Sequence, residues 1–220
     1  MANIIKSADQ QHLLFLFLPI KKGTFHHAAT TLNHFEKVVS DLSANDNPDV
    51  RAATGVHFFL FYGLAADQKP AGMLVPSFQT FPGKDLLVVQ AIYDADFAPY
   101  IASFVTQDSI AQGLNLILSL ADESGIPGVD PEDPTTAVNI LANGGVQSNP
   151  DAFNCFLMRY NFADPTIPAG GAGKNAKYLF GGTFPGLTVG KILDNYPDAE
   201  TLWPYPPVTP DFAESFKPQC

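Results

Sequence analysis

The sequence has few cysteines, few basic residues and no long apolar segment. Only two cysteines, Cys155 and Cys220, occur in 220 residues, too few for a disulfide framework, so we expect a reduced, cytoplasmic setting. Lysine and arginine total 12 against 22 acidic residues, which gives a formal net charge of −10. An acidic chain without a basic stripe repels phosphate backbones and anionic lipid headgroups, which argues against nucleic acid and membrane partners.

The longest early apolar run, LLFLFLPI at 13–20, is too short to span a bilayer. No basic segment precedes this run, and no small-residue cleavage site follows it as it would in a secretory signal. The run therefore predicts a buried strand in a soluble protein.

Apolar residues are plentiful, whereas charged residues are not. Hydrophobic residues make up 46% of the chain and charged residues 15%, a balance typical of a globular protein with a sizeable core. Eighteen phenylalanines accompany a single tryptophan, so we expect a core or cavity lined with flat apolar rings. We interpret 1–220 as one domain.

The order of the expected elements indicates a fold class. Strands are predicted at 12–20, 54–65, 85–93 and 153–162, and helices at 24–42 and from 94 to 105. A helical insertion follows at about 106–150, and the chain is Pro/Gly-rich and irregular from about 163, with one short helix near 187–196. This order is that of an α+β ferredoxin-like sandwich, an antiparallel sheet with helices on one face.

The strand at 56–64 is apolar on both faces. Val56, Phe58, Leu60, Tyr62 and Leu64 form one face, and the other carries His57, Phe59, Phe61 and Gly63. An ordinary sandwich leaves one sheet face in water, so something has to cover the second face. We therefore expect a homodimer whose sheets pack face to face.

Two segments, GVHFFLFYGL (55–64) and DLLVVQAIYDADFAPYIASF (85–104), resemble those of the dimeric α+β barrel proteins, in particular uncharacterised bacterial relatives. FPGLTVGKIL (184–193) is similar to a downstream segment of those relatives, so the resemblance covers about half of the chain. This superfamily includes chlorite dismutases and dye-decolourising peroxidases. The resemblance implies two sheets that close into a barrel around a cavity holding haem, a small organic molecule or nothing.

The sequence also departs from that superfamily. The Gly-x-x-Asp-Gly signature of dye-decolourising peroxidases does not occur, so their distal aspartate has no counterpart here. The segments PAG (70–72) and TFPG (80–83) recur at 168–170 and 183–186. This repetition leaves open a tandem duplication that would close the barrel within one chain.

Polar residues on or beside the apolar strands are the candidate ligand-binding groups. His57 either faces a cavity or is a buried neutral imidazole, and the paired carboxylates of Asp94 and Asp96 serve either acid–base chemistry or helix capping. Arg159, expected on a strand, needs a partner or a ligand anion unless it reaches water at an edge. A barrel dimer would bring the second and fourth strands together. The candidates are His57, Phe59, Phe61, Tyr62, Tyr93, Asp94, Asp96 and Arg159.

Three functions are compatible with these residues. The first is binding of a small apolar or aromatic ligand in a phenylalanine-lined cavity. The second is a haem-dependent, peroxidase-like enzyme with a histidine as axial ligand and Arg159 as a distal group. The third is a structural homodimer without a ligand site. No His-x-x-x-His or Cys-x-x-Cys pattern occurs, so no metal site is predicted, and the cofactor and the reaction stay open.

Overall fold

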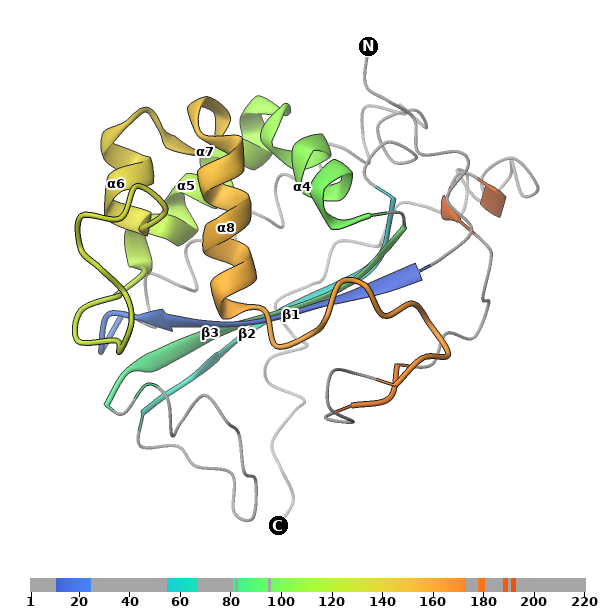
Figure 1. Cartoon of the computed structure of the whole chain (residues 1–220), viewed down its shortest axis with the longest axis horizontal. Helices are drawn as coiled ribbons and strands as arrows, with labels where there is room; N and C mark the ends of the chain where they lie inside the picture. The colour runs from blue at the N-terminus through green and yellow to red at the C-terminus, as the bar shows by residue number, and fades with distance from the viewer. Residues whose placement is uncertain are drawn as a thin grey trace, which may run out of the picture.

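The computed structural model describes residues 11–24, 55–66, 81, 83–94, 96–172, 178–180, 188–189 and 191–192. These residues form a mixed α+β structure with a three-stranded sheet and helices (Figure 1). The strands are β1 (Gln11–Ile20), β2 (Val56–Leu64) and β3 (Asp85–Asp94). The helices are α4 (Phe97–Val105), α5 (Asp108–Leu120), α6 (Ala137–Ala142), α7 (Gly145–Ser148) and α8 (Pro150–Tyr160).

Strand β3 lies at the centre of the sheet, in the order β1-β3-β2. It runs antiparallel to both neighbours, so β1 and β2 run in the same direction on either side of it. Gln11 pairs with Asp94 at one end of the sheet, and Ile20 pairs with Asp85 at the other. The register of β2 shifts between Val56 and Phe58, so the bulge leaves His57 beside the end of β3.

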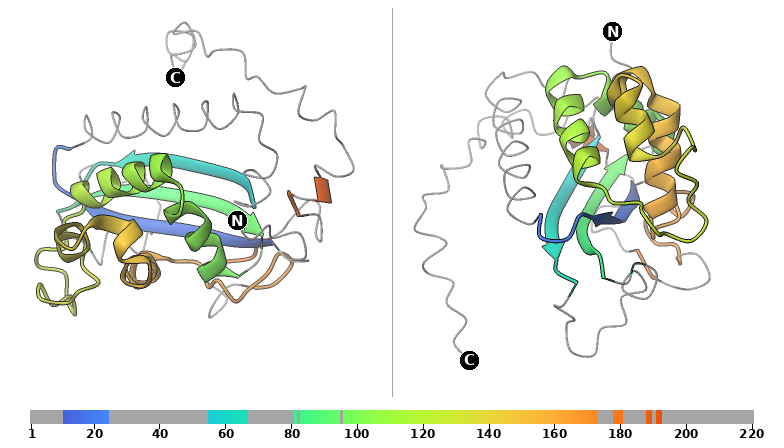
Figure 2. Two further views of the ribbon diagram at one scale, coloured as in Figure 1. Left: turned by 90° about the horizontal axis from the view of Figure 1, so that it is seen from above. Right: turned by 90° about the vertical axis from the view of Figure 1, so that its left-hand side faces the viewer.

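The helices cover one face of the sheet (Figures 1 and 2). The even-numbered residues of β1 and the odd-numbered residues of β3 point toward them, and side chains of α4, α5, α6 and α8 complete this core. Leucine, isoleucine, valine and aromatic residues dominate both strands, which explains their continuous apolar runs. The sheet residues of this core are Leu14, Leu16, Leu18, Ile20, Leu87, Val89, Ala91 and Tyr93.

The opposite face of the sheet is apolar as well. Phe17, Leu86 and Val88 are buried there, and the partly buried residues packed against them are Phe15, Tyr62, Leu64, Phe81 and Phe162. The prediction of two apolar faces is therefore confirmed for the described strands. On β2, Phe58 and Leu60 of this face are 50% and 42% exposed.

The outer edge of β1 is covered by the chain that follows α8. Isolated antiparallel bridges join Leu16 to Asn161 and His12 to Pro168. The backbone N–H of Phe162 donates to the carbonyl of Phe15 over 2.7 Å. This segment therefore satisfies edge groups that would otherwise be unpaired.

The prediction of a strand at 153–162 is wrong, because residues Pro150–Tyr160 form helix α8. The buried residues Phe153, Phe156, Leu157 and Tyr160 follow at steps of three and one, which is the period of a helix face. Pro150 occupies the first turn, where a proline is compatible with a helix. The same sequence also alternates apolar residues through Met158, but Met158 is 40% exposed.

Other predicted elements compare well where the structure describes them. The first three strands, the helix that starts after Asp94 and the helical segment at 106–150 are confirmed, although turns separate the helices of that segment. The predicted helix at 24–42 and most of the chain after 172 lie outside the described residues. Within the part that the structure describes, no helix has the length and apolarity needed to cross a membrane.

Candidate functional site

His57 and Asp94 form a hydrogen-bonded pair at the end of the sheet where β3 finishes. Nε2 of His57 lies 2.7 Å from Oδ1 of Asp94. The side chain of Asp94 is 1% exposed, whereas that of His57 is 15% exposed. The carboxylate is therefore buried behind the imidazole, and the imidazole is partly exposed to solvent.

The second oxygen of Asp94 is also occupied. Oδ2 accepts a hydrogen bond of 2.7 Å from the backbone N–H of Val189, which follows the buried Thr188. The backbone N–H of Asp94 donates to the carbonyl of Gly55 over 2.8 Å. Asp94 therefore links β2, β3 and Val189, and its position is fixed by three hydrogen bonds.

Gly55 is required where it stands, directly before the bulge of β2. Its φ of +58° is in the left-handed region, and an added Cβ would come within 3.2 Å of the Cβ of Asp94. Glycine is the residue that tolerates both constraints. The turn before β2 thus brings the backbone close to Asp94 and directs His57 to the carboxylate.

This geometry assigns the protons of the pair. An ionised carboxylate can only accept hydrogen bonds, so beside ionised Asp94 the Nε2–H of His57 is the donor. In the neutral imidazole, Nδ1 then carries the lone pair. Among the described residues, no side chain or backbone group bonds to Nδ1 of His57. A histidine held at one nitrogen and open at the other is the arrangement of an oriented proton acceptor.

A second buried aspartate on β3 shows what a purely structural carboxylate looks like. Asp85, at the opposite end of the strand, is 3% exposed. It accepts from the backbone N–H of Gly23 at 2.7 Å and from that of Ala66 at 3.0 Å. Asp85 therefore ties two turns to the sheet, whereas Asp94 holds a titratable side chain.

Helix capping does not account for Asp94. Asp96 occupies the N-cap position of α4, and its side chain makes no capping hydrogen bond. Asp96 is exposed, and the carboxylate of Asp94 is committed to His57 and Val189. The two acids that the sequence places side by side therefore differ in burial and in role.

Tyr93 lies on the helix-covered face beside this pair and is fully buried. Its ring stacks on Tyr100 of α4 with a centroid distance of 4.0 Å. Burial, together with the negative charge of Asp96, raises the pKa of Tyr93 well above its usual range. Its cross-strand partner is His12 of β1, which the sequence interpretation overlooked. A histidine at the start of an apolar strand was the available signal.

The aromatic candidates on β2 divide between the two faces of the sheet. Phe59 and Phe61 pair with residues of the helix-covered core and contact each other edge to face at 5.7 Å. Tyr62 lies on the opposite face, packed against the cluster around Phe17. Burial raises the pKa of Tyr62. The four candidates on β2 therefore do not line a single surface within one chain.

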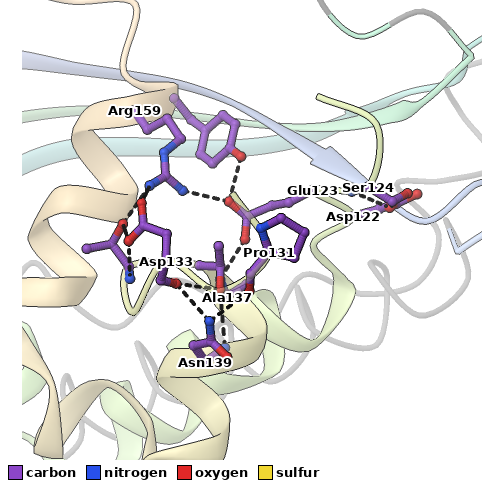
Figure 3. A network of polar contacts seen from close by, with 11 residues as sticks. Asp122, Glu123, Ser124, Pro131, Asp133, Ala137, Asn139 and Arg159 are labelled. Atoms are coloured by element: carbon purple, nitrogen blue, oxygen red, sulfur yellow. Dashed lines mark hydrogen bonds and ion pairs between the residues drawn. The ribbon is translucent and has the colours of Figure 1, made fainter. Parts of the chain in front are cut away.

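Arg159 is not on a strand and is not near His57. It lies in the last turn of α8, where its guanidinium binds Glu123 and Asp133, each over 2.9 Å (Figure 3). Asp122, next to Glu123, donates its N–H to the carbonyl of Pro19. Arg159 thus belongs to the sheet end opposite His57, and its partners come from this chain.

The described residues bring together His57, Tyr93, Asp94 and Asp96 at one end of the sheet, with His12 added. Anywhere in the part of the chain that the structure describes, no group of three or more His, Cys, Asp or Glu side chains could hold a metal ion. Comparison with protein-family models, with curated proteins and with solved structures finds no match to this chain.

Proposed function

We propose that this protein binds a small aromatic molecule, and that His57, oriented by Asp94, forms a hydrogen bond to a polar group of this ligand. The hydrogen bond of 2.7 Å between a buried carboxylate and a partly exposed imidazole carries the proposal. Small-molecule sites combine mostly apolar walls with a few well-placed polar groups. The aromatic residues of β1 and β2 that face away from the helices, Phe15, Phe17 and Tyr62, supply the walls, and His57 supplies the polar group.

We also propose that the chain has a ferredoxin-like arrangement and assembles as a homodimer. The order β1-β3-β2, with the segment after α8 along the outer edge of β1, supports a ferredoxin-like arrangement. The apolar face away from the helices supports packing against the sheet of a second copy, as in a dimeric α+β barrel. In this dimer, the ligand lies between the two sheets and Tyr62 is one of the residues beside it.

Binding of 4-nitrophenol tests the proposal, because ionisation of this phenol changes its visible absorbance. The phenol O–H bond breaks and an Nδ1–H bond forms on His57, so bound 4-nitrophenol absorbs as the phenolate below the pH at which it ionises in water. We expect His57→Phe to abolish this change and to weaken binding about tenfold, which corresponds to about 1.4 kcal/mol. Asp94→Asn should reduce the change, because a neutral amide stabilises the imidazolium less well.

The matched control is Asp108→Asn on α5, which removes an exposed carboxylate that accepts from Gln147. This variant should bind 4-nitrophenol as the original chain does. Equal binding and equal ionisation by the His57→Phe variant would contradict the proposal. If the protein is a dimer and 4-nitrophenol does not bind, the structural homodimer without a ligand site is the better description.

A haem-dependent, peroxidase-like function is the second candidate, and one observation favours it. Metal-ligating histidines usually donate their other ring N–H to a carboxylate, as His57 does to Asp94. In this respect His57 would hold the iron through Nδ1, whereas Arg159 is already bound by Glu123 and Asp133. Haem would supply redox chemistry at iron. A Soret band that appears with haemin and is lost in His57→Phe would support this function, and no band would refute it.

A further inference from the structure

A turn from the last described part of the chain reaches the pair formed by His57 and Asp94. Val189 lies 95 positions after Asp94 in the sequence, and its backbone N–H donates to Oδ2 of Asp94 over 2.7 Å. Asp94 and Thr188 are each 1% exposed, so this contact is made in the interior. A backbone donor cannot change rotamer as a side-chain donor can, so it holds the carboxylate in one orientation.

Thr188 determines where the N–H of Val189 points. The carbonyl of Thr188 accepts from the N–H of Ile192 over 3.0 Å, and its Oγ1 accepts from the N–H of Lys191 over 3.1 Å. These are the two contacts of a threonine that caps the start of a helical turn. The N–H of the first residue in such a turn has no partner within the turn. The capped turn therefore presents the N–H of Val189 to Asp94.

This contact bears on His57 through the geometry of the carboxylate. The two oxygens of Asp94 share one plane, so a hydrogen bond to Oδ2 also restricts the position of Oδ1, which lies 2.7 Å from Nε2 of His57. We propose that Thr188 and Val189 are positioning residues, which orient Asp94 so that His57 is protonated at Nε2 and offers Nδ1 to the ligand. This inference rests on the proposed binding of a small aromatic molecule at His57.

Val189→Pro tests the inference, because proline lacks the N–H but is compatible with the first position of a helical turn. Val189→Ala keeps the N–H and is the matched control. The readout is the tautomer of neutral His57 without ligand, measured in long-range proton–nitrogen NMR spectra. We expect the Nε2–H tautomer in the original chain and in Val189→Ala, and a mixture of both tautomers in Val189→Pro. An Nε2–H tautomer that persists in a folded Val189→Pro variant would overturn the inference.

Substitutions of Thr188 provide a second test that does not depend on the folding of Val189→Pro. Thr188→Val removes the capping hydroxyl but keeps the size of the side chain, whereas Thr188→Ser keeps the hydroxyl. Thr188→Val should shift the tautomers toward a mixture, and Thr188→Ser should not. Equal tautomers in these two variants would contradict a positioning role for the cap.

Binding of 4-nitrophenol separates this inference from the proposed function. Val189→Pro should reduce the ionisation of the bound phenol and weaken its binding, by no more than the loss of about tenfold expected for His57→Phe. If the original chain binds 4-nitrophenol and Val189→Pro changes neither the tautomer nor the ionisation, this inference fails alone. If Val189→Pro shifts the tautomer but the original chain does not bind 4-nitrophenol, the proposed function fails and the orientation of His57 by Val189 stands.

Discussion

At the scale of single residues, the two aspartates that bound β3 have different partners. Asp85 accepts two backbone N–H groups, so its carboxylate holds two turns against the sheet. Asp94 accepts one backbone N–H and one imidazole N–H, so its carboxylate orients the side chain of His57. The sequence gives both residues the same setting, an acid at the end of an apolar strand. The turn at Gly23 brings a backbone N–H to Asp85, whereas the turn at Gly55 brings the imidazole of His57 to Asp94.

We expect the titration of His12 to make the stability of the fold depend on pH. Burial lowers its pKa in the folded state, against the opposing effect of Asp96, whereas in the unfolded chain its pKa is near 6.5. The unfolded state therefore binds more protons below that pH, and the free energy of unfolding should fall as the pH drops through 6.5. One extra proton bound by the unfolded state changes the free energy of unfolding by at most about 1.4 kcal/mol per pH unit.

Urea unfolding of the original chain and of His12→Phe, followed at pH values on both sides of 6.5, measures this contribution. The difference in unfolding free energy between the two proteins should change with pH only below that value. Parallel curves for the two proteins over the whole range would show that His12 does not titrate on unfolding.

At the scale of elements, α8 depends on a polar network as well as on its apolar face. Glu123 accepts from Arg159 and from Tyr160 over 2.9 and 2.7 Å, and its other oxygen accepts from the N–H of Ala137 over 2.6 Å. Asp133 and Thr135 bind the same guanidinium (Figure 3). The network therefore joins α8 to the long turn before α6 and to the start of α6.

Arg159→Met should lower the free energy of unfolding by about 2 kcal/mol, because it leaves the largely buried Glu123 with an uncompensated charge. Lys84→Met is the comparison, since the carboxylate of its partner Asp122 is 23% exposed against 10% for Glu123, so water compensates part of the lost charge and the loss should be smaller. Chemical denaturation of both variants gives the comparison. Equal losses in the two variants would mean that burial of the Arg159 network adds nothing.

The same network explains why the sequence pattern predicted a strand where helix α8 forms. The apolar strands β1, β2 and β3 were predictable, because runs of leucine, valine and phenylalanine with glycine at their ends leave few alternatives. Residues 153–162 satisfy both a period of two and a helical period, and on a strand Arg159 needs a partner or a ligand anion. Contacts with Glu123 and Asp133, far away in the sequence, decide in favour of the helix.

The pairing of His57 with Asp94 could not be predicted either, because it depends on a bulge in β2 that the sequence does not mark.

At the scale of the whole molecule, the sheet separates two apolar layers. One layer is filled by the helices, and the other contains the aromatic cluster around Phe17. Phe15 and Phe17 both meet Phe162 edge to face at 6.0 Å. A second copy packed on this layer would bury Phe58 and Leu60, which are half-exposed in the single chain. The half-exposed Phe58 and Leu60 on this face are the observation that the proposed dimer rests on.

Leu60→Lys tests the proposed dimer, because it places a charge on the face that the second sheet would cover. We expect this variant to sediment as a folded monomer where the original chain sediments as a dimer, with an unchanged far-ultraviolet circular dichroism spectrum. Val138→Lys on α6 is the control, since Val138 is 71% exposed on the helical side, and should remain a dimer. A Leu60→Lys variant that stays dimeric would place the contact elsewhere.

The central position of β3 also has a consequence for synthesis of the chain. Every strand pairing in the described sheet includes β3, and β1 and β2 do not pair with each other. While the ribosome adds the residues up to 94, the Phe-rich strands β1 and β2 have no native strand partner. Exposed strands of this kind associate readily with other chains, so the nascent protein should recruit chaperones early and release them once β3 has emerged.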